Sequence, residues 1–93
     1  MSLKMISFEK WKTLSSRDQL GHIAAEILRA NLMKNKEPSL CRQMLERAIS
    51  LVDISLNDPK WHNNPLPLLI LRTELAKAYI DERVDLGKIY MAL

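Results

Sequence analysis

Two proline-containing breaks divide this chain into long segments in which apolar residues recur every three or four positions. The breaks are NKEPS at residues 35–39 and SLNDPKWHNNPLP at residues 55–67. Apolar residues at this spacing lie on one side of an α-helix, and a break as short as the first makes the two flanking helices antiparallel neighbours. The chain is therefore predicted to be all-α, as an antiparallel three-helix bundle.

The bounds of the predicted helices follow from these breaks. A shortage of Val and Thr disfavours a sheet, and 93 residues are enough for one modest core, so residues 1–93 are predicted to form a single helical domain. We expect a short extra N-terminal helix, three long helices and a short helical tail, at about residues 7–14, 17–35, 39–56, 65–83 and 84–92.

The second break has the composition of a stiff corner. Asp58 before Pro59 and Asn64 before Pro65 are both typical of a helix N-cap followed by the first helical residue. Trp61 lies between these two starts. We interpret Trp61 as a structural anchor that packs over the ends of two helices.

The same corner also offers a metal-site alternative. Asp58 and His62 are four positions apart and would share a face if the corner were helical. Two ligands do not make a metal site, and no second His or Cys cluster supports them. With no Gly-rich phosphate loop and no nucleophile beside a matching base, the sequence predicts no metal and no cofactor.

Arg17 and His22 are the one candidate catalytic pair. Their spacing matches the Arg-x4-His pattern of HEPN-type ribonucleases, in which a histidine acts as acid or base and an arginine holds a phosphate. The alternative interpretation is a solvated histidine near the start of a long helix. The net charge of +3 is spread along the chain and forms no single basic block, so nucleic-acid binding has no further support.

Arg72 falls inside the apolar arc of the last long helix, where a guanidinium must be paired or must reach water. Its candidate partners are the carboxylates of Asp53, Glu46 and Asp58. We favour a structural ion pair that fixes the last two helices, with Asp53 as an anchor, over a pocket for an anion.

The run LPLLILR, residues 66–72, is apolar on all sides of its helix. Its core positions leave Leu66, Leu69 and Ile70 facing outward. A contiguous outward apolar patch is typical of an interface. The sequence therefore predicts a non-catalytic interaction module that acts through self-association or a protein partner. An RNA-binding or RNA-cleaving bundle that uses Arg17 and His22 is the alternative.

Two features bear on location. No apolar run approaches the roughly 18 residues that a membrane span needs, and no signal peptide is visible. A single cysteine, Cys41, fits a reducing compartment, so we expect a cytoplasmic protein. A weaker alternative is binding to a membrane surface through the aromatic residues Phe8 and Trp11. The lysines that would assist this binding are Lys4, Lys10 and Lys12.

One stretch carries a resemblance. RAISLVDISLNDPKW, with KWKTLSSRDQLGHIAAEILRA before it and LILRTELAKAYI after it, resembles a group of small bacterial helical proteins with no known activity. Those proteins share a Leu-Asp pair, an Asp-Pro-basic-Trp run and a Leu-Arg-x-Glu run, which correspond here to Asp53, Asp58, Pro59, Trp61, Arg72 and Glu74. The resemblance implies architectural roles for Trp61 and Arg72 and no particular activity.

Overall fold

The computed structural model describes residues 7–93, which form five α-helices and one short 3-10 helix. The all-helical prediction is confirmed, and residues 7–93 contain no strand. In chain order the elements are α1 (Phe8–Lys12), α2 (Ser16–Met33), α3 (Pro38–Leu56), the 3-10 helix η1 (Pro59–Trp61), α4 (Leu66–Ile80) and α5 (Leu86–Met91).

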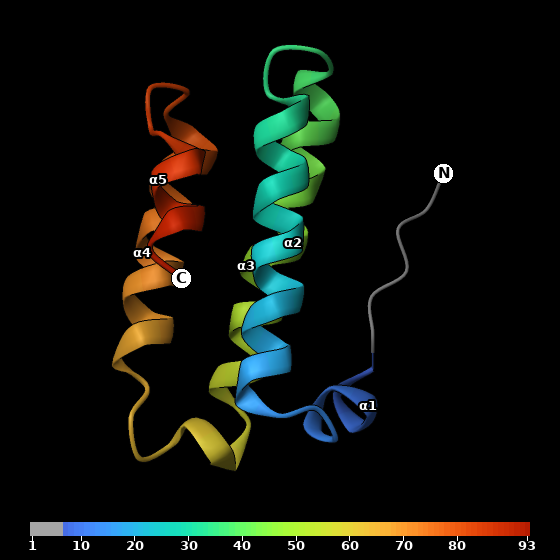
Figure 1. The fold of residues 1–93 in the computed structure, drawn as a ribbon, viewed down its shortest axis with the longest axis vertical. Coiled ribbons are helices and arrows are strands. Elements are labelled where there is room, and N and C mark those ends of the chain that lie inside the picture. Colours follow the sequence, from blue (N-terminus) through green and yellow to red (C-terminus); the bar gives the residue numbers. More distant parts are fainter. Residues whose placement is uncertain (1–6) are drawn as a thin grey trace.

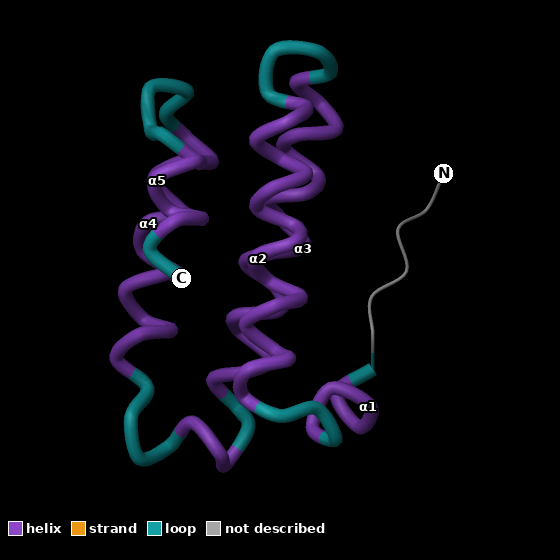
Figure 2. The backbone as a smooth tube through the Cα atoms, viewed as in Figure 1, coloured by secondary structure: helices purple, strands orange, loops and turns teal. Residues whose placement is uncertain are grey.

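The helices alternate in direction along the long axis of the molecule (Figure 1). α2 and α3 form a hairpin with the most extensive contact, and α4 packs on α3. α5 then returns along α4 and contacts both α4 and α2, and the turns that join α2, α3, α4 and α5 lie at the ends of the bundle (Figure 2). The short tail expected from the sequence is thus the helix α5, which packs against α2. The expected three-helix arrangement did not include this contact.

Side chains at the helix starts explain where several elements begin. The Ser15 hydroxyl accepts a hydrogen bond from the Asp18 N–H at 3.1 Å at the start of α2, and the Asp85 carboxylate caps α5 in the same way. The cap expected at Asn64 is wrong. Pro65 occupies the N-cap position of α4 and its side chain makes no capping hydrogen bond.

α4 ends at Ile80, three residues before the end that the sequence predicted. The Asp81 carboxylate accepts a hydrogen bond from the Arg83 N–H at 3.0 Å and also binds the Arg83 guanidinium. A short acidic side chain that bonds to the backbone two residues later favours a turn over a further helical turn. The turn that results directs the chain back toward α2.

The core is one cluster of buried apolar side chains shared by all five α-helices. Residues at helical spacing in α2, α3 and α4 supply most of it, as the periodicity predicted. The largest fully buried apolar side chains in it are Trp11, Ile23, Ile27, Val52, Leu68 and Leu75.

Burial of Trp11 removes the membrane-surface alternative in the form that the sequence suggested. The indole is almost fully buried, and its N–H donates to the Ser55 hydroxyl at 2.8 Å, so the ring is not available to lipid. Lys4, the first lysine of that alternative, lies outside the described residues. No helix within residues 7–93 combines the length and the apolar character needed to cross a membrane.

Candidate functional site

The corner between α3 and α4 contains a buried polar network built around Gln19 of α2. The Gln19 amide nitrogen donates to the Trp11 carbonyl at 2.9 Å and to the Asp58 carboxylate at 3.0 Å. Its amide oxygen accepts a hydrogen bond from the Trp61 indole N–H at 2.6 Å. Both amide protons and the oxygen are therefore satisfied away from water, which is the condition under which a buried amide stabilises a fold.

Ser55 extends this network into α3, and Lys60 adds a second link between η1 and α1. The Ser55 hydroxyl accepts from the Trp11 indole and donates to the Leu51 carbonyl at 2.8 Å within α3. The Lys60 ammonium binds the Asp58 carboxylate and also the Lys12 carbonyl, at 3.0 Å. The network thus joins α1, α2, α3 and η1, and the residues it uses are engaged with one another.

Sequence reasoning identified Trp61 and Asp58 but missed Gln19 and Ser55. Both are polar residues at positions where the helical spacing requires core residues, Gln19 four positions before Ile23 and Ser55 four positions after Leu51. A polar side chain within an apolar stripe is the signal that could have identified them, because burial forces such a group to find a partner.

The network sets the acidity of Asp58, which is 2% exposed. Burial alone raises the pKa of its carboxyl, but hydrogen bonds from Lys60 and Gln19 outweigh burial and lower the pKa from 3.8 to about 2. The carboxylate is therefore charged in the folded protein at every pH above about 2. Its role here is to hold η1 against α1 and α2.

Acid should weaken the fold through Asp58. Because its folded-state pKa is lower than its unfolded-state pKa, the ionised carboxylate contributes about 2 kcal/mol to the free energy of unfolding above about pH 4. This contribution disappears as the pH falls from about 4 to about 2. Urea unfolding of Asp58→Asn should show a lower stability than wild type at pH 6, with the difference closing at pH 2. Asp18→Asn, at an exposed position, is the matched control, and a constant difference between wild type and Asp58→Asn across this range would contradict the assignment.

The corner does not form the alternative metal site. Asp58 is buried and bound to Lys60, whereas the His62 side chain is exposed. Within residues 7–93 no group of three or more His, Cys, Asp or Glu side chains is placed to hold a metal ion.

Arg17 and His22 lie on different sides of α2. Five positions at about 100° per residue place them roughly 140° apart around the helix. Arg17 lines a groove next to the C-terminal residues, and the His22 ring lies 5.8 Å from the Trp11 ring, centroid to centroid. Glu26, one helical turn after His22, is buried between α2 and α3 beside Arg47. The structure does not bring Arg17 and His22 together at one site.

Arg72 is exposed and forms a two-pronged ion pair with Asp53, with hydrogen bonds of 2.6 and 3.3 Å. The Tyr79 hydroxyl donates to the Glu46 carboxylate at 2.6 Å further along the same two helices. Both contacts bridge α3 and α4 on the surface of the bundle. An exposed ion pair contributes little to stability, but two bridges of this kind define how α4 lies on α3.

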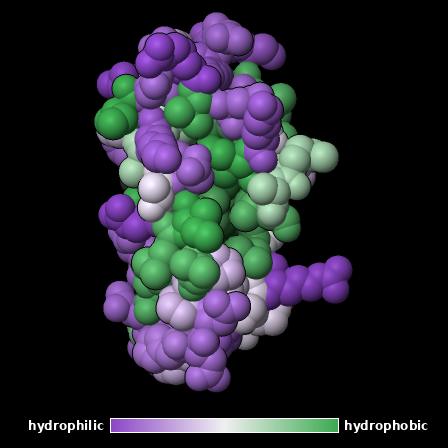
Figure 3. Space-filling view, turned by 90° about the vertical axis from the view of Figure 1, so that its left-hand side faces the viewer, coloured by the Kyte–Doolittle hydropathy of each residue, from purple (hydrophilic) through white to green (hydrophobic). Residues whose placement is uncertain are grey.

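The outward face of α4 is apolar. Leu66, Leu69, Ile70 and Ile80 are 59%, 45%, 55% and 84% exposed. Figure 3, which looks onto the side where α4 and α5 lie, shows hydrophobic surface across the middle of this side and hydrophilic surface toward both ends. We call Leu66, Leu69, Ile70 and Ile80 the outer patch of α4.

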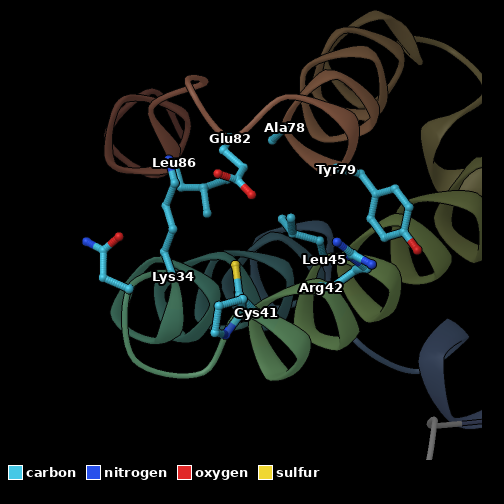
Figure 4. Close-up of a pocket in the computed structure, with 10 residues that line it drawn as sticks. Lys34, Cys41, Arg42, Leu45, Ala78, Tyr79, Glu82 and Leu86 are labelled. Atoms are coloured by element: carbon cyan, nitrogen blue, oxygen red, sulfur yellow. The ribbon is translucent and has the colours of Figure 1, made fainter.

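A pocket of about 540 Å³ lies at the opposite end of the bundle from the corner, where the α2–α3 and α4–α5 turns meet. Figure 4 shows the Cys41 side chain pointing from α3 into this space, with Lys34 on one side and Arg42 and Tyr79 on the other. Glu82 reaches toward it from the α4–α5 turn. The pocket has a buried apolar floor and a charged rim, and no residue of it was singled out from the sequence as a site.

The two cations of the rim, Lys34 and Arg42, both influence the Cys41 thiol. Burial raises the pKa of the Cys41 thiol, while the positive charges of Lys34 and Arg42 act in the opposite direction. The Arg42 guanidinium lies 5.9 Å from the Tyr79 ring centroid, and the Lys34 ammonium donates to the Val84 carbonyl at 3.0 Å.

Comparison with protein-family models, with curated proteins and with solved structures finds no significant match for this chain. The resemblance to small bacterial helical proteins therefore stays a prediction.

Proposed function

We propose that this protein is a non-catalytic helical interaction module that associates with a second copy of itself through the outer patch of α4. The observation that supports this proposal is the exposure of Leu66, Leu69 and Ile70 on one contiguous face. Single exposed apolar residues are ordinary on protein surfaces, but an apolar face several residues long is typical of an interface.

The character of α4 as a whole strengthens this argument. Its inner face contributes Leu68, Leu71 and Leu75 to the core, so the helix is apolar on two opposite sides. A helix that is apolar all round is typically buried on both sides. The Arg72–Asp53 and Tyr79–Glu46 bridges hold α4 against α3 and so present the outer patch as a preformed surface.

A second copy is the partner that the composition of the patch favours. Two-fold association brings the same surface of both copies together and places Ile70 close to its own counterpart. An apolar patch is complementary to itself because no like charges are opposed at its centre. A different protein with an apolar helix is the second possibility in the same class.

We take α2, α3 and α4 as the antiparallel three-helix framework, with α5 added beside α2. The single buried Cys41 supports a reducing compartment such as the cytoplasm. The alternative function, an RNA-binding or RNA-cleaving bundle, would require Arg17 and His22 to act together, and their placement on different sides of α2 does not favour it.

Ile70→Glu should weaken self-association at least about tenfold, because a two-fold interface would bury two carboxylates without partners. Helix content should stay unchanged, since Ile70 is 55% exposed in the single chain. Sedimentation equilibrium over a concentration series measures the effect. The matched control is Leu32→Glu, which places the same charge at a position of α2 that is 58% exposed and should leave association as in wild type. Wild type that sediments as a monomer at high micromolar concentration would refute the proposal.

A further inference from the structure

The pocket between the two turns has the build of a small-molecule site. Four buried side chains form its apolar floor, and these are Cys41, Leu45, Ala78 and Leu86. Polar and charged side chains stand around the rim and make up about half of the lining (Figure 4). Ligand pockets in proteins typically enclose about 300–1,000 Å³ and combine an apolar lining with a few polar groups, and a volume of about 540 Å³ lies within this range.

Hydrogen-bond donors dominate the rim. Arg42 makes no ion pair with a carboxylate of residues 7–93, and its guanidinium lies over the ring of Tyr79, so its guanidinium protons remain available to a ligand. Lys34 uses one proton on the Val84 carbonyl and retains two. Glu82 is the one carboxylate that lines the pocket, so the rim carries two positive charges and one negative charge.

Neighbouring charges outside the lining do not reverse this balance. The Asp81 carboxylate is bound by Arg83, and the Glu46 carboxylate accepts the Tyr79 hydroxyl proton. The first turn of α3 also lines the pocket at Pro38, and the two exposed residues before it, Lys36 and Glu37, carry opposite charges.

We propose that this pocket binds a small amphiphilic carboxylic acid, whose apolar chain covers the floor at Cys41 and Leu45 and whose carboxylate lies beside the Arg42 guanidinium. A planar guanidinium with free protons is well suited to a carboxylate, which it can bind through two parallel hydrogen bonds. The site shares no residue with the outer patch of α4 and is independent of self-association.

The charge of Glu82 distinguishes an amphiphilic acid from an amphiphilic amine or zwitterion as the ligand of this pocket. An amphiphilic acid is repelled by the Glu82 carboxylate, so removal of that charge tightens its binding. An amphiphilic amine, or a zwitterion whose ammonium binds Glu82, loses affinity when that charge is removed. The sign of the Glu82→Gln effect is therefore diagnostic.

The test is a titration of the full chain with hexanoate, hexan-1-ol and hexylamine, followed by NMR chemical shifts or calorimetry at low ionic strength. Hexanoate should bind more tightly than either of the other two, with shifts centred on the floor of the pocket. Arg42→Gln should weaken hexanoate binding about tenfold, and Glu82→Gln should strengthen it. Lys36→Gln removes the same charge from the neighbouring α2–α3 turn, at a residue that does not line the pocket, and should have a much smaller effect.

The proposal would be overturned by equal or tighter binding of hexylamine or hexan-1-ol, by no response to Arg42→Gln, or by weaker hexanoate binding in Glu82→Gln. Circular dichroism shows whether each variant is folded, and the comparison of the three probes on the wild type needs no variant. Absence of binding by all three probes would also reject the site.

Discussion

Trp61→Ala should lower the free energy of unfolding by about 3–5 kcal/mol, the usual effect of truncating a buried aromatic side chain. Trp61 is 8% exposed and its indole N–H binds the Gln19 amide oxygen at 2.6 Å. The substitution leaves a cavity between η1 and α2 and also leaves that oxygen without its partner. Chemical unfolding followed by circular dichroism measures the change.

Two controls make the Trp61 experiment specific. His62→Ala changes the next residue, which is exposed, and should leave stability within about 0.5 kcal/mol of wild type. Trp61→Phe retains an aromatic ring but removes the indole N–H, and should fall between wild type and Trp61→Ala. A melt of Trp61→Ala that matches wild type would show that the corner does not depend on this side chain.

Gln19→Leu should lower the free energy of unfolding by a similar amount, about 3–5 kcal/mol, although leucine has nearly the same volume as glutamine. The substitution removes both amide donors and the amide oxygen, so the Trp61 indole N–H loses its partner inside the protein, while the Trp11 carbonyl keeps only the backbone N–H of Leu14. Each buried group left without a partner costs about 1–3 kcal/mol. The removal of the bond to Asp58 adds to the loss.

Gln43→Leu is the matched control for Gln19→Leu. Gln43 is exposed on α3, so the same substitution there should change stability by less than about 0.5 kcal/mol. If the two variants unfold at the same denaturant concentration, the network around Gln19 contributes nothing measurable. Because Gln19 and Trp61 are in contact, the effects of their substitutions should not be additive.

These predictions assign the corner an architectural role. Trp61 and Asp58, which the resemblance includes, bind Gln19 and so close one end of the bundle with α1. The outer patch of α4 and the pocket between the two turns lie elsewhere, and neither depends on a residue of the network. Variants of the network should therefore alter stability, while variants of the patch and of the pocket should alter binding.

The sequence was most informative where structure depends on residues within one or two helical turns. Apolar spacing indicated the helices, and the Asp58 cap at the start of η1 followed from the same short range. The prediction at Asn64 was wrong because Pro65 itself takes the cap position. The predicted end of α4 was wrong because Asp81 forms a turn with Arg83 in place of further helix.

Outward-facing residues were predictable for the same reason. Successive helical residues lie about 100° apart, so Leu66, Leu69 and Ile70 had to face away from Leu68 and Leu71 whatever α4 packs against. In the structure these three side chains are exposed, as helical geometry requires. Their role as an interface is a property of an assembly and stays a prediction.

Contacts between distant parts of the chain were decided only by the tertiary structure. Trp61 was predicted to pack over the ends of two helices. Its hydrogen-bond partner, Gln19, is 42 positions earlier in the chain and was not predicted. The pocket depends in the same way on the α2–α3 and α4–α5 turns meeting at one end of the bundle. No local pattern encodes the distance between two turns, so the packing of α2, α3, α4 and α5 alone determined that Lys34 and Arg42 lie on either side of one cavity.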